Sequence, residues 1–402
     1  MRILNINVVY AKGSTGYLTL KIHRFLTFKS IENHIIYGRG LRPIETDVYK
    51  SCTELESNIH HAFANIFDNV YGGCFFATNK MIRLIKKIKP DVVHLHCCNG
   101  YFVNLYRLFN FLKKNNYKVV ITNHAEFYYT GNCGYSFECD KWKSGCGKCP
   151  HIKEFNGKYT LDRTHKNWIK MKNALDGFNK DNIIITSVSP WVTSRSKESP
   201  ILKQYKHVTV LNGINTNNFI YHDMNECRKE LNLPLDKKIY IFIVSNWNEY
   251  SKKGYFEKIV DSIPDAIFLI AGSPKDYQYN NVINLGFVND QKLLSKYYSA
   301  SNKTLLLSKK ETFSLPVAES LCSGTPVVGF YSGGPETIAI KEYSEFCNYG
   351  DIEELSKLIN KEDNYDREKI SKEACELYSL ERMANEYIDV YKELLYKQSK
   401  EE

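Results

Sequence analysis

The sequence predicts an α/β protein with two doubly wound Rossmann-like domains that face a central cleft. Short apolar runs alternate with helical stretches along the first half of the chain, and the alternation starts again after residue 235. This pattern is typical of βαβ units with a parallel sheet. A chain of 402 residues is also longer than a single hydrophobic core ordinarily accommodates, and this length is typical of two domains.

The first half contains six candidate strands, and its helical stretches lie between them. The predicted strands span residues 2–9, 34–37, 91–96, 118–122, 182–188 and 207–211. The predicted helices include residues 17–27, 59–67, 79–89 and 102–114. The helix at 79–89 is basic and amphipathic, and the helix at 102–114 is aromatic and basic. Both could lie against an anionic membrane, or their apolar stripes could face the core.

The second half repeats the pattern with five candidate strands. They span residues 239–245, 266–271, 282–285, 304–307 and 325–330. The polar stretch 212–235 between the halves reads as a domain boundary. We therefore predict an N-terminal Rossmann-like domain at 1–214, a C-terminal Rossmann-like domain at 215–378, and a C-terminal helix at 379–402 that packs back on the first domain.

Composition limits the class of protein and its partners. Hydrophobic residues make up 43% of the chain, no apolar run could span a bilayer, and the first residues are too polar for a signal peptide. These features predict a cytoplasmic protein. The net charge of +9 favours anionic partners. It is spread without a block of five like charges, so we expect no nucleic acid partner.

Four of the twelve cysteines form a cluster. Cys133, Cys139, Cys146 and Cys149 have the spacing C-x5-C-x6-C-x2-C. In a reducing compartment such a group suggests a structural Zn²⁺ site, and the alternative is reduced thiols in an irregular loop. A four-thiolate site leaves no open position, which argues against a catalytic metal.

Two glutamates stand near the end of a predicted strand in the second half. Glu311 follows strand 304–307, and Glu319 lies one turn inside a helix that Pro316 can start. Open α/β sheets bind ligands at the carboxyl ends of their strands. Carboxylates there can accept hydrogen bonds from the vicinal hydroxyls of a ribose or hexose. The alternative is that these acids only complement a helix dipole.

Weaker motifs occur at the ends of other predicted strands. Gly13 and Gly16 follow the first strand and would let a phosphate or sugar approach the backbone closely. An ordinary strand–helix turn explains these two glycines equally well. Lys253, after the first strand of the second half, could neutralise a diphosphate or be a solvated loop charge.

Histidines and a second glycine pair complete these motifs. His124 follows a strand and would face the cleft or serve as a structural hydrogen-bonding group. His94 and His96 point to one face of a strand, where metal binding is conceivable without an evident third ligand. The segment Gly333-Gly334-Pro335-Glu336 would expose backbone N–H groups to an anion, with Glu336 as a helix cap.

Taken together, these motifs resemble the family 4 retaining glycosyltransferases, which have the GT-B fold. The glycine turn, the N-G-I-N at 212–215, the Lys253–Gly254 pair, the E-x7-E of Glu311 and Glu319, and the G-T-P-V-V and G-G-P-E segments appear in the family order. Segment 123–150, with G-S-T-G and H-L-H-x-x-N-G-Y, resembles the branch of colanic-acid-type transferases in bacterial exopolysaccharide assembly.

The resemblance implies roles for individual residues. Glu319 would bind the ribose of the nucleotide, and Glu311 would hold sugar hydroxyls near the reacting carbon. His124 would line the donor sugar, so His124 and Glu311 are the candidate catalytic residues. The implied donor-binding residues are Gly16, Lys252, Lys253, Glu311, Phe313, Ser314, Leu315 and Glu319.

The chain departs from the family pattern at two of these positions. An arginine often precedes the lysine–glycine pair, whereas this region reads V-S-N-W-N-E-Y, so either Lys252 substitutes or the phosphate contacts are weaker. Ala125 follows His124 where aspartate is usual, and Glu126 comes next.

The function that the resemblance implies is sugar transfer from a UDP- or GDP-sugar to a glycan acceptor, lipid-linked, in exopolysaccharide, capsule or O-antigen assembly. No obligatory metal or other cofactor is expected for catalysis. The enzyme would work in the cytoplasm at the inner face of the plasma membrane, in peripheral contact with anionic lipid. The alternatives are a nucleotide-sugar 2-epimerase or phosphorylase of the same fold, and a basic nucleic-acid-binding protein with a cysteine loop.

Overall fold

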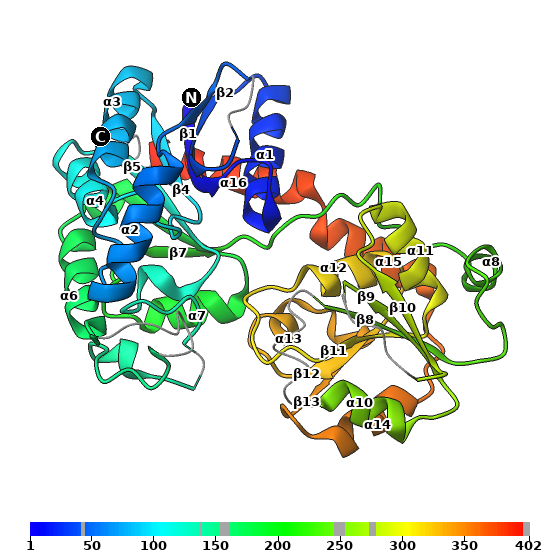
Figure 1. Cartoon of the computed structure of the whole chain (residues 1–402). Coiled ribbons are helices and arrows are strands. Elements are labelled where there is room, and N and C mark those ends of the chain that lie inside the picture. The colour runs from blue at the N-terminus through cyan, green and yellow to red at the C-terminus, as the bar shows by residue number, and fades with distance from the viewer. Residues whose placement is uncertain (42–44, 137, 153–160, 245–253, 273–278, 397–402) are drawn as a thin grey trace. The chain divides into compact units, whose positions relative to one another are not determined.

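The computed structural model describes residues 1–41, 45–136, 138–152, 161–244, 254–272 and 279–396 (Figure 1). The chain divides into two compact units. Unit 1 consists of Met1–Leu211 and Met383–Glu402, and unit 2 of Asn212–Arg382.

Unit 1 is built on a seven-stranded parallel sheet in the order β3-β2-β1-β4-β5-β6-β7. The order reverses between β1 and β4, which makes the sheet doubly wound. The strands are β1 (Arg2–Val9), β2 (Glu32–Arg39), β3 (Val48–Lys50), β4 (Val92–Leu95), β5 (Lys118–Asn123), β6 (Ile183–Ser187) and β7 (Lys206–Thr209). Six of them match predicted strands. The edge strand β3 was missed because three residues are too few for a periodic signal.

Helices cover both faces of this sheet (Figure 1). They are α1 (Gly13–Phe28), α2 (Glu54–Phe67), α3 (Phe75–Ile88), α4 (Leu105–Lys114), α6 (Thr164–Leu175) and α7 (Pro190–Glu198). The apolar residues of α3 and α4, such as Met81, Ile85 and Phe109, are buried in the core against β4 and β5. The core-facing alternative is therefore correct for the apolar stripes at 79–89 and 102–114.

Unit 2 repeats the architecture with six parallel strands in the order β10-β9-β8-β11-β12-β13. Counted from β8, this is the 3-2-1-4-5-6 order of a Rossmann sheet, with its reversal between β8 and β11. The strands are β8 (Ile239–Ile243), β9 (Ile267–Ala271), β10 (Val282–Gly286), β11 (Lys303–Leu306), β12 (Val327–Phe330) and β13 (Ser344–Cys347). The fold class predicted from the sequence is thus confirmed in both units.

The helices of unit 2 also lie on both faces of its sheet, with α10 and α14 on one face and α11, α12 and α15 on the other (Figure 1). They are α8 (Met224–Glu230), α10 (Tyr255–Ser262), α11 (Gln291–Ala300), α12 (Leu315–Cys322), α13 (Pro335–Ile338), α14 (Ile352–Asn360) and α15 (Arg367–Tyr378).

The last helix, α16 (Leu380–Tyr396), contributes most of its length to unit 1. Its Tyr391 hydroxyl hydrogen-bonds His94 on β4 at 2.7 Å, and the Lys118 ammonium of β5 donates to the Leu394 carbonyl at 2.7 Å. None of the described helices has the length and apolar character that a bilayer span requires.

Candidate active site

The loop after β11 brings Glu311 to the point where the strand order of unit 2 reverses, which is where Rossmann-type sheets bind ligands. The Glu311 N–H donates to the Ser332 carbonyl at 3.0 Å, and its carbonyl accepts from the Gly334 N–H at 2.9 Å. The Ser308 hydroxyl donates to Glu311 Oε1 at 3.3 Å. The carboxylate is therefore carried by a backbone that two hydrogen bonds tie to the loop after β12.

Gly334 is required for this arrangement. A Cβ at this position would lie 2.2 Å from the Thr312 carbonyl oxygen and 2.7 Å from the Phe313 nitrogen. Real carbon atoms do not approach backbone so closely, so a side chain here would push the 311–314 loop away. The glycine pair therefore lets two loops pack directly against each other.

Gly333 and Gly334 donate their N–H groups within the protein and do not present them to an anion, which corrects the expectation from the sequence. The Glu336 carboxylate accepts from Ser332 N–H at 3.1 Å and Gly333 N–H at 2.8 Å, and Gly334 N–H donates to Glu311. Glu336 stabilises the turn before α13, as the capping part of that expectation stated.

Ser314 precedes α12 in a strained conformation, with φ 76° and ψ 96°. Non-glycine residues seldom adopt positive φ, and such strain gathers at functional sites. The Ser314 hydroxyl is buried and has no hydrogen-bond partner among the described residues. Phe313 beside it is buried, whereas Leu315 is partly exposed. The structure thus holds a polar group at the helix N-terminus without a partner in the described part of the chain.

Glu319 lies in the second turn of α12, and its side chain is partly exposed. The Tyr298 hydroxyl donates to Glu319 Oε2 at 3.2 Å. Burial raises the pKa of Glu319 to about 7, and the Tyr298 hydrogen bond opposes this only in part. A carboxyl group with such a pKa can both accept and donate hydrogen bonds near neutral pH, which suits a pair of sugar hydroxyls.

Lys252 and Lys253 lie outside the described residues, so their predicted contact with a diphosphate stays a prediction. Gly254, which follows them, has φ 61° and begins α10. A left-handed residue at a helix start is a position that glycine occupies at little cost.

In unit 1, Gly16 lies in the first turn of α1 directly against the end of β1. A Cβ here would lie 3.0 Å from Val9 Cγ2 and 3.3 Å from the Val9 carbonyl oxygen. The close approach of α1 to the strand therefore depends on the missing side chain. Gly16 thus has the packing role expected of an ordinary strand–helix turn. Its role in donor binding stays a prediction.

His124 follows β5 and contacts a second histidine on the neighbouring strand. Its Nε2 lies 3.3 Å from His96 Nδ1, and His96 Nε2 lies 3.0 Å from Asn5 Oδ1. Burial lowers the pKa of His124 to about 4, so the ring is neutral at pH 7. A neutral imidazole can hydrogen-bond a sugar but cannot neutralise a diphosphate by charge.

His94 and His96 are fully buried, and burial lowers the pKa of both rings well below the usual value. His94 contacts Tyr391 and Thr122, each at 2.7 Å. Within the described residues, no three His, Cys, Asp or Glu side chains are arranged to hold a metal ion. His94 on β4 and His96 directly after this strand thus belong to a buried hydrogen-bond network.

Sequence reasoning missed Tyr298, Ser308 and Asn5, which orient the predicted site residues. A tyrosine in helix 291–300 and a serine after a strand are ordinary residues, so no local pattern marks them. Asn5 carried a weak signal, because a buried asparagine in an apolar strand needs a hydrogen-bond partner.

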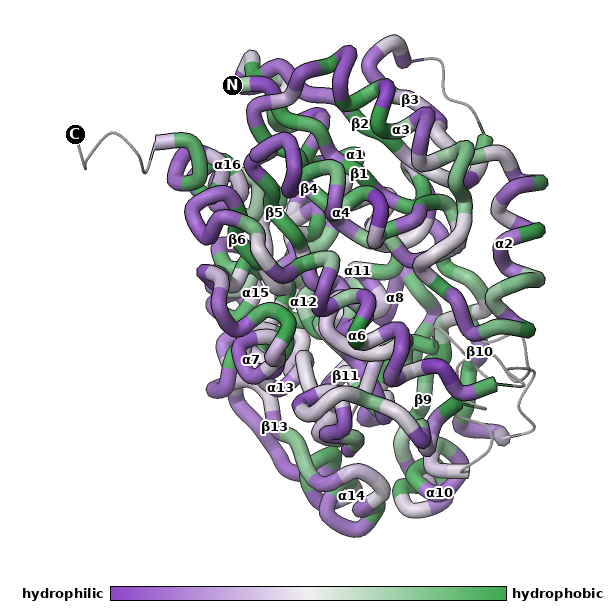
Figure 2. Tube along the Cα trace, turned by 90° about the vertical axis from the view of Figure 1, so that its left-hand side faces the viewer, coloured by the Kyte–Doolittle hydropathy of each residue, from purple (hydrophilic) through white to green (hydrophobic). Residues whose placement is uncertain are grey.

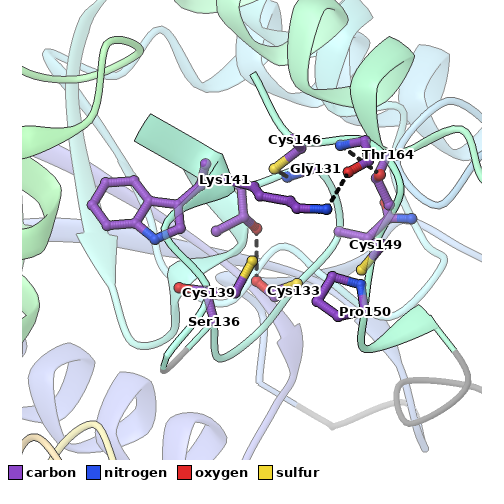
Figure 3. A pocket seen from close by; sticks show the side chains of 13 residues that line it. Gly131, Cys133, Ser136, Cys139, Lys141, Cys146, Cys149, Pro150 and Thr164 are labelled. Carbon is purple, nitrogen blue, oxygen red and sulfur yellow. Dashed lines mark hydrogen bonds between the residues drawn. The ribbon is translucent and has the colours of Figure 1, made fainter. Parts of the chain in front are cut away.

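The four clustered cysteines line one narrow pocket of about 10 Å³, and Figure 3 shows them around it with Lys141 and Pro150. A hydrogen bond between Cys133 and Cys149 lowers the pKa of the Cys149 thiol to about 7 and raises that of Cys133. The Gly131 N–H donates to Cys146 Sγ at 3.2 Å. The thiols share one pocket without a ready metal geometry, and zinc binding stays a prediction.

Comparison with known proteins agrees with this architecture. Residues 223–376 match the family described as glycosyl transferases group 1, and residues 51–137 match glycosyl transferase 4-like. WcaC of Escherichia coli, named as a colanic acid biosynthesis glycosyl transferase, is 24% identical over 98% of this chain and 100% of its own length.

Solved structures show the same fold. Sucrose-phosphate synthase from Thermosynechococcus elongatus has a TM-score of 0.68 at 17% identity, covering 98% of this chain and 99% of its own. HepE from Anabaena, solved with UDP-glucose, has a TM-score of 0.63 at 12% identity, covering 97% of this chain and 99% of its own. The chain therefore has the GT-B fold, and its residues 223–376 form a domain of the glycosyl transferases group 1 type.

Proposed function

We propose that this glycosyltransferase retains anomeric configuration and transfers a sugar from a UDP- or GDP-sugar to a lipid-linked glycan acceptor. Its product would belong to a bacterial exopolysaccharide, capsule or O-antigen. The carboxylates Glu311 and Glu319 beside the switch point of the unit 2 sheet carry this proposal. The name of WcaC supports the polysaccharide context, and the UDP-glucose complex of HepE supports the donor class.

In this mechanism the protein positions the donor and the acceptor and stabilises the departing diphosphate. It supplies no nucleophile. Glu319 binds the ribose hydroxyls, and Glu311, oriented by Ser308, holds hydroxyls of the donor sugar. The acceptor attacks the anomeric carbon from the face that the diphosphate leaves, and the configuration is thereby kept. Holding the two reactants in place and stabilising the departing diphosphate supply most of the rate enhancement.

Unit 1 would bind the acceptor, with His124 near the donor sugar. Because its imidazole is neutral, His124 would contribute a hydrogen bond to a sugar hydroxyl. Lys252 and Lys253 would stabilise the diphosphate. We place the working enzyme at the cytoplasmic face of the membrane, where a lipid-linked acceptor is presented.

Thermal-shift measurements against UDP-, GDP- and ADP-sugars test the donor class. We expect one uridine or guanosine nucleotide to raise the melting temperature, since a ligand of the folded state stabilises it by mass action. The anomeric configuration of the product, determined by NMR from an α-linked donor, tests the mechanism. A β-linked product would overturn retention.

A second candidate is an epimerase or phosphorylase on the same fold. Incubation with the donor alone distinguishes it, because an epimerised nucleotide sugar would form without any acceptor. We expect the donor to remain unchanged apart from slow hydrolysis.

A further inference from the structure

Helix α2 has its apolar side turned to solvent. Its residues Leu55, Ile59, Phe63, Ile66 and Phe67 are exposed, although their spacing puts them on one helix face. The buried face carries Ser57, His60 and Ala64 instead. A surface helix of a globular protein normally shows the opposite arrangement. Figure 2 shows hydrophobic stretches along the outer side of the α2 tube.

Polar contacts fix α2 in this orientation. His60 Nε2 lies 3.0 Å from the Asn69 carbonyl oxygen, and His60 Nδ1 lies 3.3 Å from Cys74 Sγ. The Glu56 carboxylate accepts the Phe76 N–H at 2.9 Å and so caps helix α3. Rotation of α2 to bury its apolar face would break all of these bonds. The exposed apolar face is therefore a stable feature of unit 1.

Helix α3 extends this face with two further aromatic side chains. Phe76 is 81% exposed and Phe75 is more than half exposed at the N-terminal end of the helix. Together with Ile59, Phe63 and Phe67 they line a pocket of about 450 Å³. Contiguous exposed apolar patches on soluble proteins mark interaction sites.

Cationic side chains border the same pocket. Arg163 and Lys170 line it, and the Arg163 guanidinium lies 5.8 Å from the centre of the Phe67 ring. Lys166 lies one helical turn before Lys170 on α6. Mutual repulsion with Lys166 and Arg163 adds to burial in lowering the pKa of Lys170. None of the three cations forms an ion pair with a described residue.

The acids nearby are already engaged with the protein backbone. Glu56 accepts N–H groups of α3. Asp68 accepts the Arg163 N–H at 2.8 Å, and Asp162 accepts the Cys149 N–H at 2.7 Å. These hydrogen bonds leave the carboxylates charged, and Asp68 attracts Arg163. Lys166 and Lys170 form no ion pair with a described residue, so an external anion would relieve the repulsion at Lys170.

We propose that the α2–α3 surface, defined by Leu55, Ile59, Phe63, Ile66, Phe67, Phe75 and Phe76, docks on an anionic lipid bilayer. Its rings insert at the headgroup level, a lipid chain enters the pocket, and Arg163, Lys166 and Lys170 bind lipid phosphates. Exposed aromatic and aliphatic residues beside cations are the combination that interfacial helices use. The inference deepens the proposed function, because a lipid-linked acceptor is reached from the membrane surface.

Vesicle co-sedimentation of the full chain tests this proposal without any sugar donor. We expect binding to vesicles that contain phosphatidylglycerol, weaker binding to pure phosphatidylcholine, and loss of binding at high salt. The double variant Phe63→Ser/Phe76→Ser should bind anionic vesicles at least tenfold more weakly. Lys166→Glu/Lys170→Glu should lose the preference for anionic lipid.

The matched control is Phe28→Ser. Phe28 on α1 is 79% exposed, nearly as much as Phe76, but lies outside the proposed surface. The Phe28→Ser substitution should leave vesicle binding unchanged. Thermal unfolding monitors folding of every variant, and substitutions at such exposed sites should leave it intact.

Three outcomes would overturn the proposal. The first is wild-type protein that does not bind vesicles, and the second is vesicle binding that Phe63→Ser/Phe76→Ser and Phe28→Ser reduce equally. The third is a dimer in analytical ultracentrifugation that Phe63→Ser abolishes, which would assign the face to a second copy. Donor binding is measured separately. Its absence would contradict the transferase assignment, whereas absence of vesicle binding would contradict only the docking surface.

Discussion

His96 and His124 form a direct contact between their rings, with His96 Nδ1 3.3 Å from His124 Nε2. Because Asn5 Oδ1 can only accept, His96 must donate from Nε2 to Asn5 and accept at Nδ1. His124 therefore carries its proton on Nε2. Asn5 and His96 are thus positioning residues that set the tautomer of His124.

Substitution of His96 tests this relationship. We expect His96→Leu to lower kcat about tenfold or more, since a wrongly presented imidazole no longer supports the reaction. The ¹⁵N chemical shifts of His124 should at the same time show a mixture of tautomers. Tyr391→Phe is the control, because it removes a hydrogen bond to His94 and leaves His96 untouched. Unchanged His124 shifts in His96→Leu would contradict the assignment.

Glu319 should make the stability of the protein depend on pH. Its pKa is about 7 in the folded state, above the ordinary value near 4.5. Between pH 4.5 and pH 7 the folded protein therefore holds a proton that the unfolded chain has lost. Its contribution to stability is therefore full below pH 4.5 and is lost as pH rises to about 7. Glu319→Gln should be more stable than wild type by about 1 to 2 kcal/mol at pH 8, allowing for partial exposure, and equal at pH 4.5. Urea unfolding at pH 4.5 and pH 8 measures the free energy of unfolding of both proteins. A difference between Glu319→Gln and wild type that does not change with pH would contradict the prediction.

Glu319 should also carry donor affinity. Loss of hydrogen bonds to a charged group costs about 1.5 to 3 kcal/mol, so Glu319→Ala should weaken nucleotide-sugar binding about tenfold to a hundredfold. Calorimetric titration measures the change. Glu342→Ala, at an exposed position of unit 2, should bind as wild type does. Full donor affinity in Glu319→Ala would remove this residue from the binding site.

Gly334→Ala should destabilise the site loop. Its Cβ would meet the Thr312 carbonyl oxygen at 2.2 Å, and the backbone would have to move. We expect a loss of about 2 to 4 kcal/mol in the free energy of unfolding, as for other strongly strained substitutions, together with weaker donor binding. Gly134→Ala is the control, because its Cβ would meet no atom within 4 Å. Equal stability of the two variants in thermal unfolding would contradict the packing argument.

The cysteine loop should bind one zinc ion. We expect Zn²⁺ to draw the four thiols of its pocket into a tetrahedron, and protein purified under reducing conditions to contain about one zinc per chain. Elemental analysis measures the metal. Cys149→Ser should lose it, whereas Cys375→Ser in unit 2 should keep it. Metal-free protein with four freely titrating thiols in this loop would show that the cysteines only pack the loop.

The order of amino acids is sufficient to predict the two parallel-sheet units and the neighbourhood of the candidate donor site. Long runs of apolar strands separated by helices leave few alternatives to a doubly wound sheet. The strand end before Glu311 and the helix start before Glu319 were both visible locally, because strand, loop and helix follow one another within about twenty residues.

Which side chains meet across strands, and which helix faces stay exposed, depends on three-dimensional packing that the sequence pattern does not show. Asn5, His96 and His124 come from three strands or strand ends, and their contact depends on strand order and register. The outward face of α2 likewise follows from contacts of His60 and Glu56 with residues far along the chain. Periodicity alone places Ile59 and Phe63 in the core. It cannot reveal that polar partners hold the opposite face of this helix inward, because those partners are brought together only by folding.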